Sequence, residues 1–177
     1  MSEVSSTKGS PQGDGLFSLT QIRHLMRVEF GRAQRYGYPI TCMIVEVDRL
    51  GYLRDLYGYD LKEAVLEDVV GVLQDHTRSC DYLGRQVDDR LMAVMPHTDR
   101  QGGLSAADRL LEQVRALNFE VDGRTLQVAV SIGITHFEDN NTLFFDQLVE
   151  GAEAAVAEAA AAGGDRYAVH DVGKVEL

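Results

Sequence analysis

The chain has 177 residues, of which 45% are hydrophobic and 25% are charged, and its formal net charge is −11. This length suits one compact domain with a hydrophobic core and is short for two ordinary domains. The negative charge opposes binding to a nucleic-acid polymer, whose phosphates require clustered Lys and Arg side chains. No apolar stretch in the sequence reaches the roughly 18 residues that span a bilayer, so we expect no membrane insertion.

The first residues of the chain have no core-forming pattern. Residues 1–15 are mainly polar residues and glycine without periodicity, and they include no apolar run of the signal-peptide type. We therefore expect a disordered tail over residues 1–15, one domain over residues 16–177, and a cytoplasmic location. Cys42 and Cys80 are too few for a disulfide framework or a zinc site, and Cys42 lies within an apolar run typical of a buried strand.

A helix and a strand are predicted first. From Leu16 onward, apolar residues recur at helical spacing, with Ser18 as a candidate N-cap and Gly37 as a stop signal. Pro39 introduces residues 40–47, a nearly continuous apolar and β-branched run. Such a run is typical of a strand that is covered on both faces.

The middle of the chain predicts two helical segments and a hairpin. A short helical segment over residues 50–57 precedes a longer helix over residues 60–77, whose Leu and Val side chains form one apolar stripe. Residues 81–85 and 91–95 are strand-like and flank residues 86–90, which we expect to be the tip of a hairpin.

The next elements are a helix and a second hairpin. Residues 99–117 have a helical apolar face. The pair Asp122-Gly123 is a strong turn signal, and it separates a strand over residues 119–121 from a longer strand over residues 126–135.

A last helix is predicted over residues 141–162, closed by Gly163-Gly164, and residues 167–169 form a final short strand. The order of elements predicts an α/β (α+β) fold in which helices flank a mixed central β-sheet.

Four motifs follow one another along the chain. Glu46-Val-Asp-Arg-Leu precedes Arg54-Asp-x-x-Gly-Tyr, then Val87-Asp-Asp-Arg-Leu91, and finally Val130-Ser-Ile-Gly-Ile. In order and spacing they resemble the Asp-x-Asp-x-Phe-Lys run, the Asn-Asp-x-x-Gly-His run, the Gly-Gly-Asp/Glu-Glu-Phe signature and a late strand of the bacterial diguanylate cyclase (GGDEF) family. The resemblance covers about residues 19–169 and implies the palm-like fold of nucleotide cyclases.

The same resemblance implies a degenerate domain. Val87 and Asp88 stand in place of the two signature glycines that leave room for the guanylyl substrate. Arg90 replaces the second signature acid, which contacts guanine and is implicated in catalysis. The base-recognising Asn and Asp of the family fall on Arg54 and Glu63.

The resemblance also concerns the triphosphate and metal positions. The residue types differ from those of the family at the first, and acids remain at the second. The family's triphosphate-binding Lys and Arg fall on Ala160 and Gly164, which leaves no fixed positive charge unless Arg166 reaches over. Glu46 and Asp89 remain at the metal positions, either as weak Mg²⁺ ligands or as solvated carboxylates. We predict no catalytic residue, no bound cofactor and no metal centre.

One binding motif remains. Many cyclases of the family bind their product, cyclic di-GMP, at an inhibitory Arg-x-x-Asp site, and Arg78-Ser-Cys-Asp81 stands at that place. Arg85-x-x-Asp88 satisfies the same pattern, so only position distinguishes the two. The alternative is structural: Arg78 would interact with carbonyls at the end of the preceding helix, and Asp81 would form a surface pair.

Arg109 falls near the place of a second arginine that the family uses for the same ligand, and Arg100 is the weaker choice. The leading hypothesis is an inactive GGDEF-like domain that binds cyclic di-GMP through Arg78, Asp81 and Arg109 and signals to a protein partner. The alternative is an interaction module, or a homodimerisation module, that binds no nucleotide. A third hypothesis is a residual enzyme that acts on GTP or another nucleotide.

Overall fold

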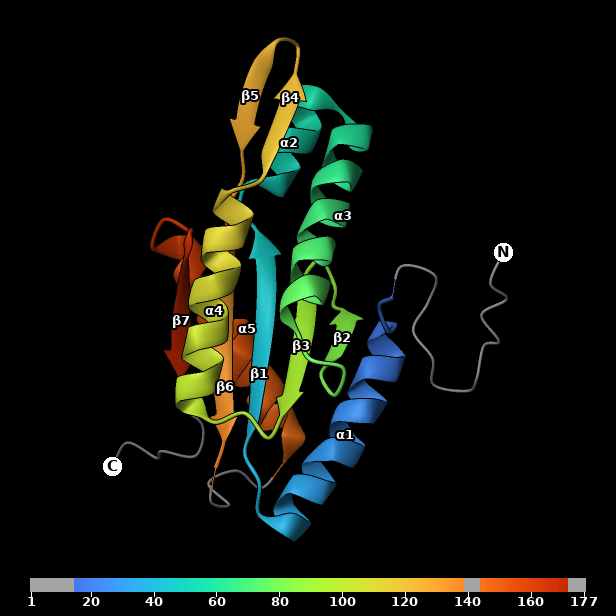
Figure 1. Ribbon diagram of the computed structural model, residues 1–177, viewed down its shortest axis with the longest axis vertical. Coiled ribbons are helices and arrows are strands. Elements are labelled where there is room, and N and C mark those ends of the chain that lie inside the picture. Colours follow the sequence, from blue (N-terminus) through green and yellow to red (C-terminus); the bar gives the residue numbers. More distant parts are fainter. Residues whose placement is uncertain (1–14, 139–143, 172–177) are drawn as a thin grey trace, which may run out of the picture.

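The computed structural model describes residues 15–138 and 144–171, which contain five helices and seven strands (Figure 1). The tail expected over residues 1–15 lies, apart from Gly15, outside these described residues, as does the expected start of the last helix at Asn141. In the described ranges, no helix is long and apolar enough to cross a bilayer. The elements are α1 (Leu19–Tyr36), β1 (Ile40–Val47), α2 (Leu50–Tyr57), α3 (Tyr59–His76), β2 (Tyr82–Arg85), β3 (Leu91–Pro96), α4 (Arg100–Arg115), β4 (Asn118–Val121), β5 (Arg124–Gln127), β6 (Val130–Phe137), α5 (Phe145–Ala161) and β7 (Arg166–His170).

The central sheet has the strand order β2-β3-β1-β6-β7. Neighbouring strands are antiparallel except β6 and β7, which are parallel. In Figure 1, α3 and α4 lie in front of the sheet and α5 lies behind it. The mixed sheet flanked by helices is therefore confirmed.

The strand β1 occupies the middle of the sheet and is covered on both faces. Met43 and Val45 belong to the hydrophobic cluster beneath α3 and α4, whereas Cys42 and Ile44 belong to the cluster beneath α1 and α5. This alternation confirms the strand inferred from the apolar run, because successive side chains of a strand point to opposite faces. Burial raises the pKa of the Cys42 thiol to about 12.

Local sequence signals set the ends of α1. Ser18 and Gln21 form a reciprocal capping box: the Gln21 N–H donates to Ser18 Oγ at 3.2 Å, and the Ser18 N–H donates to Gln21 Oε1 at 3.0 Å. At the other end, Gly37 has a φ of 75° and donates its N–H to Ala33 O at 2.8 Å. The predicted N-cap and stop signal of this helix are confirmed.

The prediction of one long strand over residues 126–135 is wrong, because the chain forms two separate strands there, β5 and β6. The strands β4 and β5 form a separate two-stranded sheet, whereas β6 pairs with β1. Between them, Ala129 O accepts a hydrogen bond from the Asp48 N–H at 2.9 Å. This bond draws the chain out of the exposed hairpin and into the central sheet.

The helix α5 lies directly on β6 at Gly133. A Cβ atom added to Gly133 would lie within 3.0 Å of Ala152 O and Val156 N, which are backbone atoms of α5. Backbone atoms of a packed helix cannot turn aside as a flexible side chain can. The close approach therefore requires a residue without a side chain.

We expect Gly133→Ala to lower the free energy of unfolding by about 1–3 kcal/mol or more, because the new methyl group pushes α5 off the sheet. Gly71→Ala is the matched control, because a Cβ at Gly71 meets no atom within 4 Å. It should stabilise α3 by about 0.5–1 kcal/mol. Urea denaturation of the three proteins checks this, and a Gly133→Ala protein as stable as wild type contradicts the close packing.

Candidate functional site

A groove of about 580 Å³ opens at the end of β1, where β1, α2, the β2–β3 hairpin and the loop after α5 meet. It brings together most of the positions at which the family resemblance places the substrate and the metal. Those that line it are Glu46, Arg54, Asp88, Asp89, Ala160 and Gly164.

The hairpin tip carries two consecutive acids in a left-handed backbone conformation, with a φ of 58° at Asp88 and 59° at Asp89. The tip is closed by hydrogen bonds from the Gln86 N–H to Arg90 O at 2.8 Å and from the Arg90 N–H to Val87 O at 3.2 Å. Asp88 and Asp89 line the groove, whereas Val87 does not line it and is 55% exposed. Of the two residues that stand in place of the signature glycines, Asp88 therefore faces the groove and Val87 does not.

Each acid at the expected metal positions is paired with a cation. The Arg90 Nε atom lies 3.3 Å from Glu46 Oε1, and the Lys62 Nζ atom lies 2.8 Å from Asp89 Oδ2. The hydrogen bond to Asp89 raises the pKa of Lys62. Lys62 is not among the residues predicted for this site, because a lysine on a helix gives no signal in the sequence that it reaches the hairpin tip.

A third acid in the groove, Asp48, holds the loop that follows α5. Its Oδ1 atom accepts a hydrogen bond from the Ser131 hydroxyl at 2.6 Å, and its Oδ2 atom accepts one from the Asp165 N–H at 2.8 Å. Arg166 donates from Nε to Gly164 O at 3.0 Å and is not among the residues that line the groove. Arg166 is therefore not one of the cations that line the groove, which are Arg49, Arg54 and Lys62.

A second cavity, of about 370 Å³, lies between the end of α3, the β3–α4 connection and α4, and Arg78, Asp81 and Arg109 all line it. The other Arg-x-x-Asp match does not contribute, since Asp88 lines the groove and Arg85 lines a different cavity. The three residues predicted for ligand binding are therefore neighbours around one cavity.

The Arg78 side chain is 54% exposed and is anchored at its Nη2 atom. Nη2 donates to Pro96 O at 2.8 Å and to the Thr98 hydroxyl. The helix carbonyls expected as partners of Arg78 are instead bonded by the Thr77 hydroxyl, which donates to Leu73 O at 2.8 Å. Within the described residues, the Arg78 side chain uses only Nη2 for hydrogen bonds, so its Nε and Nη1 atoms keep their donors.

The structural alternative made Asp81 one half of a surface pair. The structure does pair Asp81 with Arg78, but the Asp81 side chain is 0% exposed. Its Oδ2 atom accepts a hydrogen bond from the Arg78 N–H at 2.8 Å. The contact between Asp81 Oδ1 and Arg78 Nη2 is longer, at 3.5 Å. The carboxylate therefore fixes the turn that carries Arg78.

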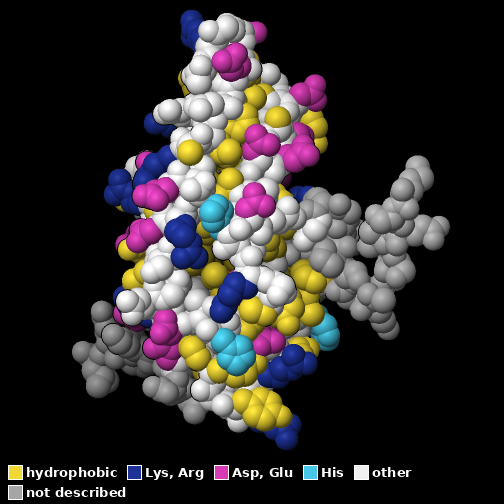
Figure 2. All heavy atoms as spheres, viewed as in Figure 1, with side chains coloured by type: hydrophobic (Ala, Val, Ile, Leu, Met, Phe, Trp, Pro, Cys, Tyr) yellow, Lys and Arg dark blue, Asp and Glu magenta, His cyan; other side chains and the backbone are white. Residues whose placement is uncertain are grey.

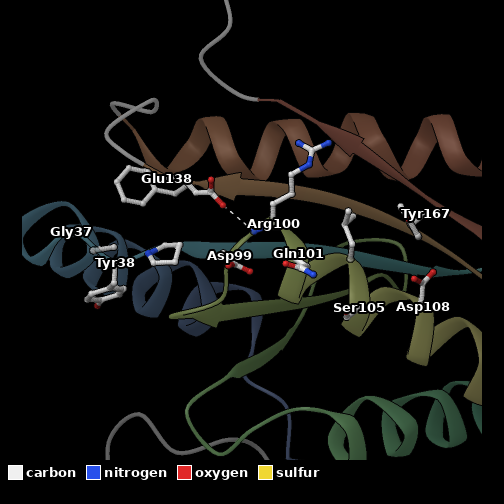
Figure 3. A pocket seen from close by; sticks show the side chains of 13 residues that line it. Gly37, Tyr38, Asp99, Arg100, Gln101, Ser105, Asp108, Glu138 and Tyr167 are labelled. Atoms are coloured by element: carbon white, nitrogen blue, oxygen red, sulfur yellow. Dashed lines mark hydrogen bonds between the residues drawn. The ribbon is translucent and has the colours of Figure 1, made fainter.

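Arg109 is exposed on α4 and has no hydrogen bond or ion pair with any other described residue. Arg100 lies elsewhere, in a cavity of about 770 Å³ that is shown in Figure 3. Its N–H donates to Glu138 Oε1 at 2.9 Å, and its Nη1 atom donates to Asp171 Oδ1 at 2.6 Å. The structure therefore separates Arg100 from Arg78 and Asp81 and leaves Arg109 beside them.

Comparison with known proteins agrees with this fold. Residues 15–166 match the family described as "Diguanylate cyclase, GGDEF domain". The chain belongs to the GGDEF family. Diguanylate cyclase DgcP of Pseudomonas aeruginosa is 26% identical to this chain over 155 residues, which are 88% of this chain and 23% of DgcP. This GGDEF chain thus spans about a quarter of that relative.

Two solved structures have the same fold as this GGDEF domain. Diguanylate cyclase SiaD from Pseudomonas aeruginosa, solved in complex with its activator SiaC, matches with a TM-score of 0.81 and 24% identity, over 92% of this chain and 61% of SiaD. The GGDEF domain of DgcB from Caulobacter crescentus, solved in complex with c-di-GMP, matches with a TM-score of 0.81 and 15% identity, over 93% of this chain and 98% of that domain.

A buried polar chain extends inward from the Arg78 anchor of this GGDEF domain. The Thr41 hydroxyl donates to Thr98 O at 2.9 Å and lies 3.0 Å from His136 Nδ1. Since the single hydroxyl proton of Thr41 goes to Thr98, His136 Nδ1 must carry the proton of that second bond. The Nε2 atom of His136 is buried without a partner among the described residues, and burial lowers the pKa of this histidine.

We expect His136 to make folding sensitive to mild acid. Because the pKa of His136 is lowered in the folded protein, the unfolded chain binds the proton more readily. The contribution of this group to the free energy of unfolding is therefore fully present above about pH 6.5 and decreases below it. The slope is at most about 1.4 kcal/mol per pH unit for this one group. His136→Gln keeps a donor for Thr41 and does not titrate, so it should lose less unfolding free energy between about pH 7 and pH 5. Denaturation curves that shift equally with pH in both proteins contradict this role.

Proposed function

We propose that this GGDEF domain is a catalytically inactive receptor for cyclic di-GMP, which binds at Arg78, Asp81 and Arg109 and signals to a protein partner. The observation that supports this most is the cavity lined by Arg78 and Arg109, whose guanidinium groups keep donors that bond no other described residue. Its volume of about 370 Å³ is within the range of small-molecule sites.

The chemistry of the cavity suits a guanine nucleotide. A guanidinium group offers a planar fork of donors that fits a phosphate or the Hoogsteen edge of guanine. The Asp81 side chain is buried in the free protein, and its longer contact with Arg78, at 3.5 Å, is the one that a bound guanine would replace, which would make Asp81 Oδ1 an acceptor for guanine N–H groups. The shorter bond to the Arg78 N–H would then keep the turn in place.

Loss of catalysis follows from missing charge and from a missing acid. Nucleotidyl transfer depends mainly on positioning and on stabilisation of phosphate charge. Ala160 and Gly164 supply no such charge, and Arg90 cannot accept a proton as the signature acid would.

Two relatives lend support to a ligand and to a partner. The GGDEF domain of DgcB was solved with c-di-GMP, and SiaD was solved with a protein activator. We extend both kinds of interaction to this chain as part of the proposal.

An interaction or dimerisation module that binds no nucleotide is the second candidate. Tyr52, Leu56 and Tyr59 are 59%, 54% and 63% exposed at the junction of α2 and α3. Hydrophobic side chains gather over the upper part of the face in Figure 2, where Figure 1 places these helices. Buried Asp81, which is already bonded to its own turn, also suits a structural role.

We expect calorimetric titration to detect binding of cyclic di-GMP and no binding of GTP or cyclic di-AMP. Arg78→Ala removes charge-assisted hydrogen bonds worth about 1.5–3 kcal/mol, so affinity should fall about ten- to a hundredfold. Arg109→Ala should weaken binding less, because Arg109 assists Arg78. Asp81→Asn should also weaken binding, because it removes the carboxylate acceptor for guanine. Asn is chosen rather than Ala because its amide oxygen can still accept the hydrogen bond from the Arg78 N–H.

The matched control is Arg85→Ala, which alters the other Arg-x-x-Asp match and should bind as wild type does. If wild type shows no saturable binding, or if Arg78→Ala binds equally well, the receptor proposal fails. The interaction module then takes its place, and sedimentation analysis decides whether the partner is a second copy of the chain.

We expect the purified protein to make no cyclic di-GMP from GTP with Mg²⁺ or Mn²⁺. Restoring the signature by Val87→Gly, Asp88→Gly and Arg90→Glu should not rescue activity, because Ala160 and Gly164 still provide no charge for the triphosphate. Chromatographic analysis of the products checks both proteins. Product formed by the unmodified protein overturns the inactive assignment.

A further inference from the structure

The GGDEF groove contains acids at the places where its family implies a divalent cation. Mg²⁺ requires oxygen ligands with available lone pairs, and it usually completes its shell with water and substrate phosphates. Whether the groove fits such an ion therefore depends on what already occupies the oxygens of its acids.

Glu46 reaches the groove from β1 and meets Arg90 from the hairpin tip. Their closest atoms, Glu46 Oε1 and Arg90 Nε, are 3.3 Å apart, and the side chains are 31% and 23% exposed. The guanidinium group is permanently charged. A divalent cation at Glu46 would therefore meet a fixed positive charge.

Asp89 is paired in the same way from another element. The Lys62 Nζ atom on α3 lies 2.8 Å from Asp89 Oδ2, and the Lys62 side chain is only 12% exposed. The ammonium also lies 5.5 Å from the centre of the Tyr59 ring, which is within reach of a cation–π contact. The Lys62 ammonium thus contacts Asp89 and the Tyr59 ring, and it also lies 3.8 Å from Glu63 Oε1.

Asp48 is a weaker candidate ligand, since each of its oxygens already uses one lone pair to accept a hydrogen bond from Ser131 or Asp165. Within residues 15–138 and 144–171, no three His, Cys, Asp or Glu side chains gather in a way that could hold a metal ion. The acids present therefore do not fit the ion that the family implies.

We propose that Arg90 and Lys62 are resident cations that replace the divalent metal of the groove. Together they neutralise Glu46 and Asp89 and fasten the hairpin tip to β1 and α3. The tip carries two acids in left-handed conformations, which are unfavourable for residues other than glycine, so these two contacts stabilise it. The inference goes beyond the proposed receptor function and is independent of it, because none of these four residues lines the Arg78 cavity.

The test uses Mn²⁺ as the probe, followed by electron paramagnetic resonance. Wild-type protein should show no saturable binding. The double variant Arg90→Gln with Lys62→Gln should gain saturable binding, with an affinity at least about tenfold above the limit that wild type sets, because two positive charges next to the acids are removed. Each single variant should fall between the two. Circular dichroism shows whether each variant is folded.

Arg54→Gln is the matched control, because Arg54 lines the same groove and its ion pair is with Asp55 instead. If Arg54→Gln raises Mn²⁺ affinity as much as the double variant, general electrostatics explains the effect and the resident-cation proposal fails. It also fails if wild type binds Mn²⁺ and Glu46→Gln abolishes that binding, a result that needs neither cation variant to fold. Cyclic di-GMP binding by the double variant should match wild type, so the two proposals fail or succeed separately.

Discussion

The carboxylate of Asp48 stands at the point where the central strand leaves the core, and it joins three parts of the fold. Its oxygens accept hydrogen bonds from Ser131 on β6 and from the Asp165 N–H just before β7. A partly buried carboxylate without such bonds would be costly. The same constraint demands Gly164, because a Cβ there would lie 2.5 Å from Asp48 Oδ2. Gly164, which the family resemblance places at a triphosphate position, is thus part of the packing around β1.

The groove and the Arg78 cavity are built from different residues, so a substitution in one need not alter the other. The groove depends on the end of β1 and the hairpin tip. The cavity depends on the turn after α3 and on the connection from β3 to α4, where Pro96 O and Thr98 hold Arg78. From Thr98 the hydrogen bonds continue to Thr41 on β1 and to His136 on β6. The contacts of Arg78 therefore lead to β1 and β6 rather than to the groove.

Much of the fold could be predicted from the sequence because its signals are local. Ser18 and Gly37 mark the ends of α1 by their own backbone chemistry, and the apolar run of β1 requires no knowledge of its neighbours. The break between β5 and β6 could not be found this way, since it depends on a bond between Ala129 and the distant Asp48. The burial of Asp81 and the reach of Lys62 to Asp89 are likewise tertiary facts, because neither residue type nor spacing specifies them.

In the groove, the identity of a residue alone does not tell whether its carboxylate is available to a metal ion. Glu46 keeps the acidic character of its position, and Asp89 keeps that of the signature, so a motif comparison counts both as retained. What a carboxylate does is set by the group that neutralises it, and here those groups are a guanidinium from the tip and an ammonium from α3. Arg90 belongs to the hairpin tip and is at the same time the partner of Glu46 on β1. The identity of this one residue therefore sets the charge at two positions of the groove, the tip and the end of β1.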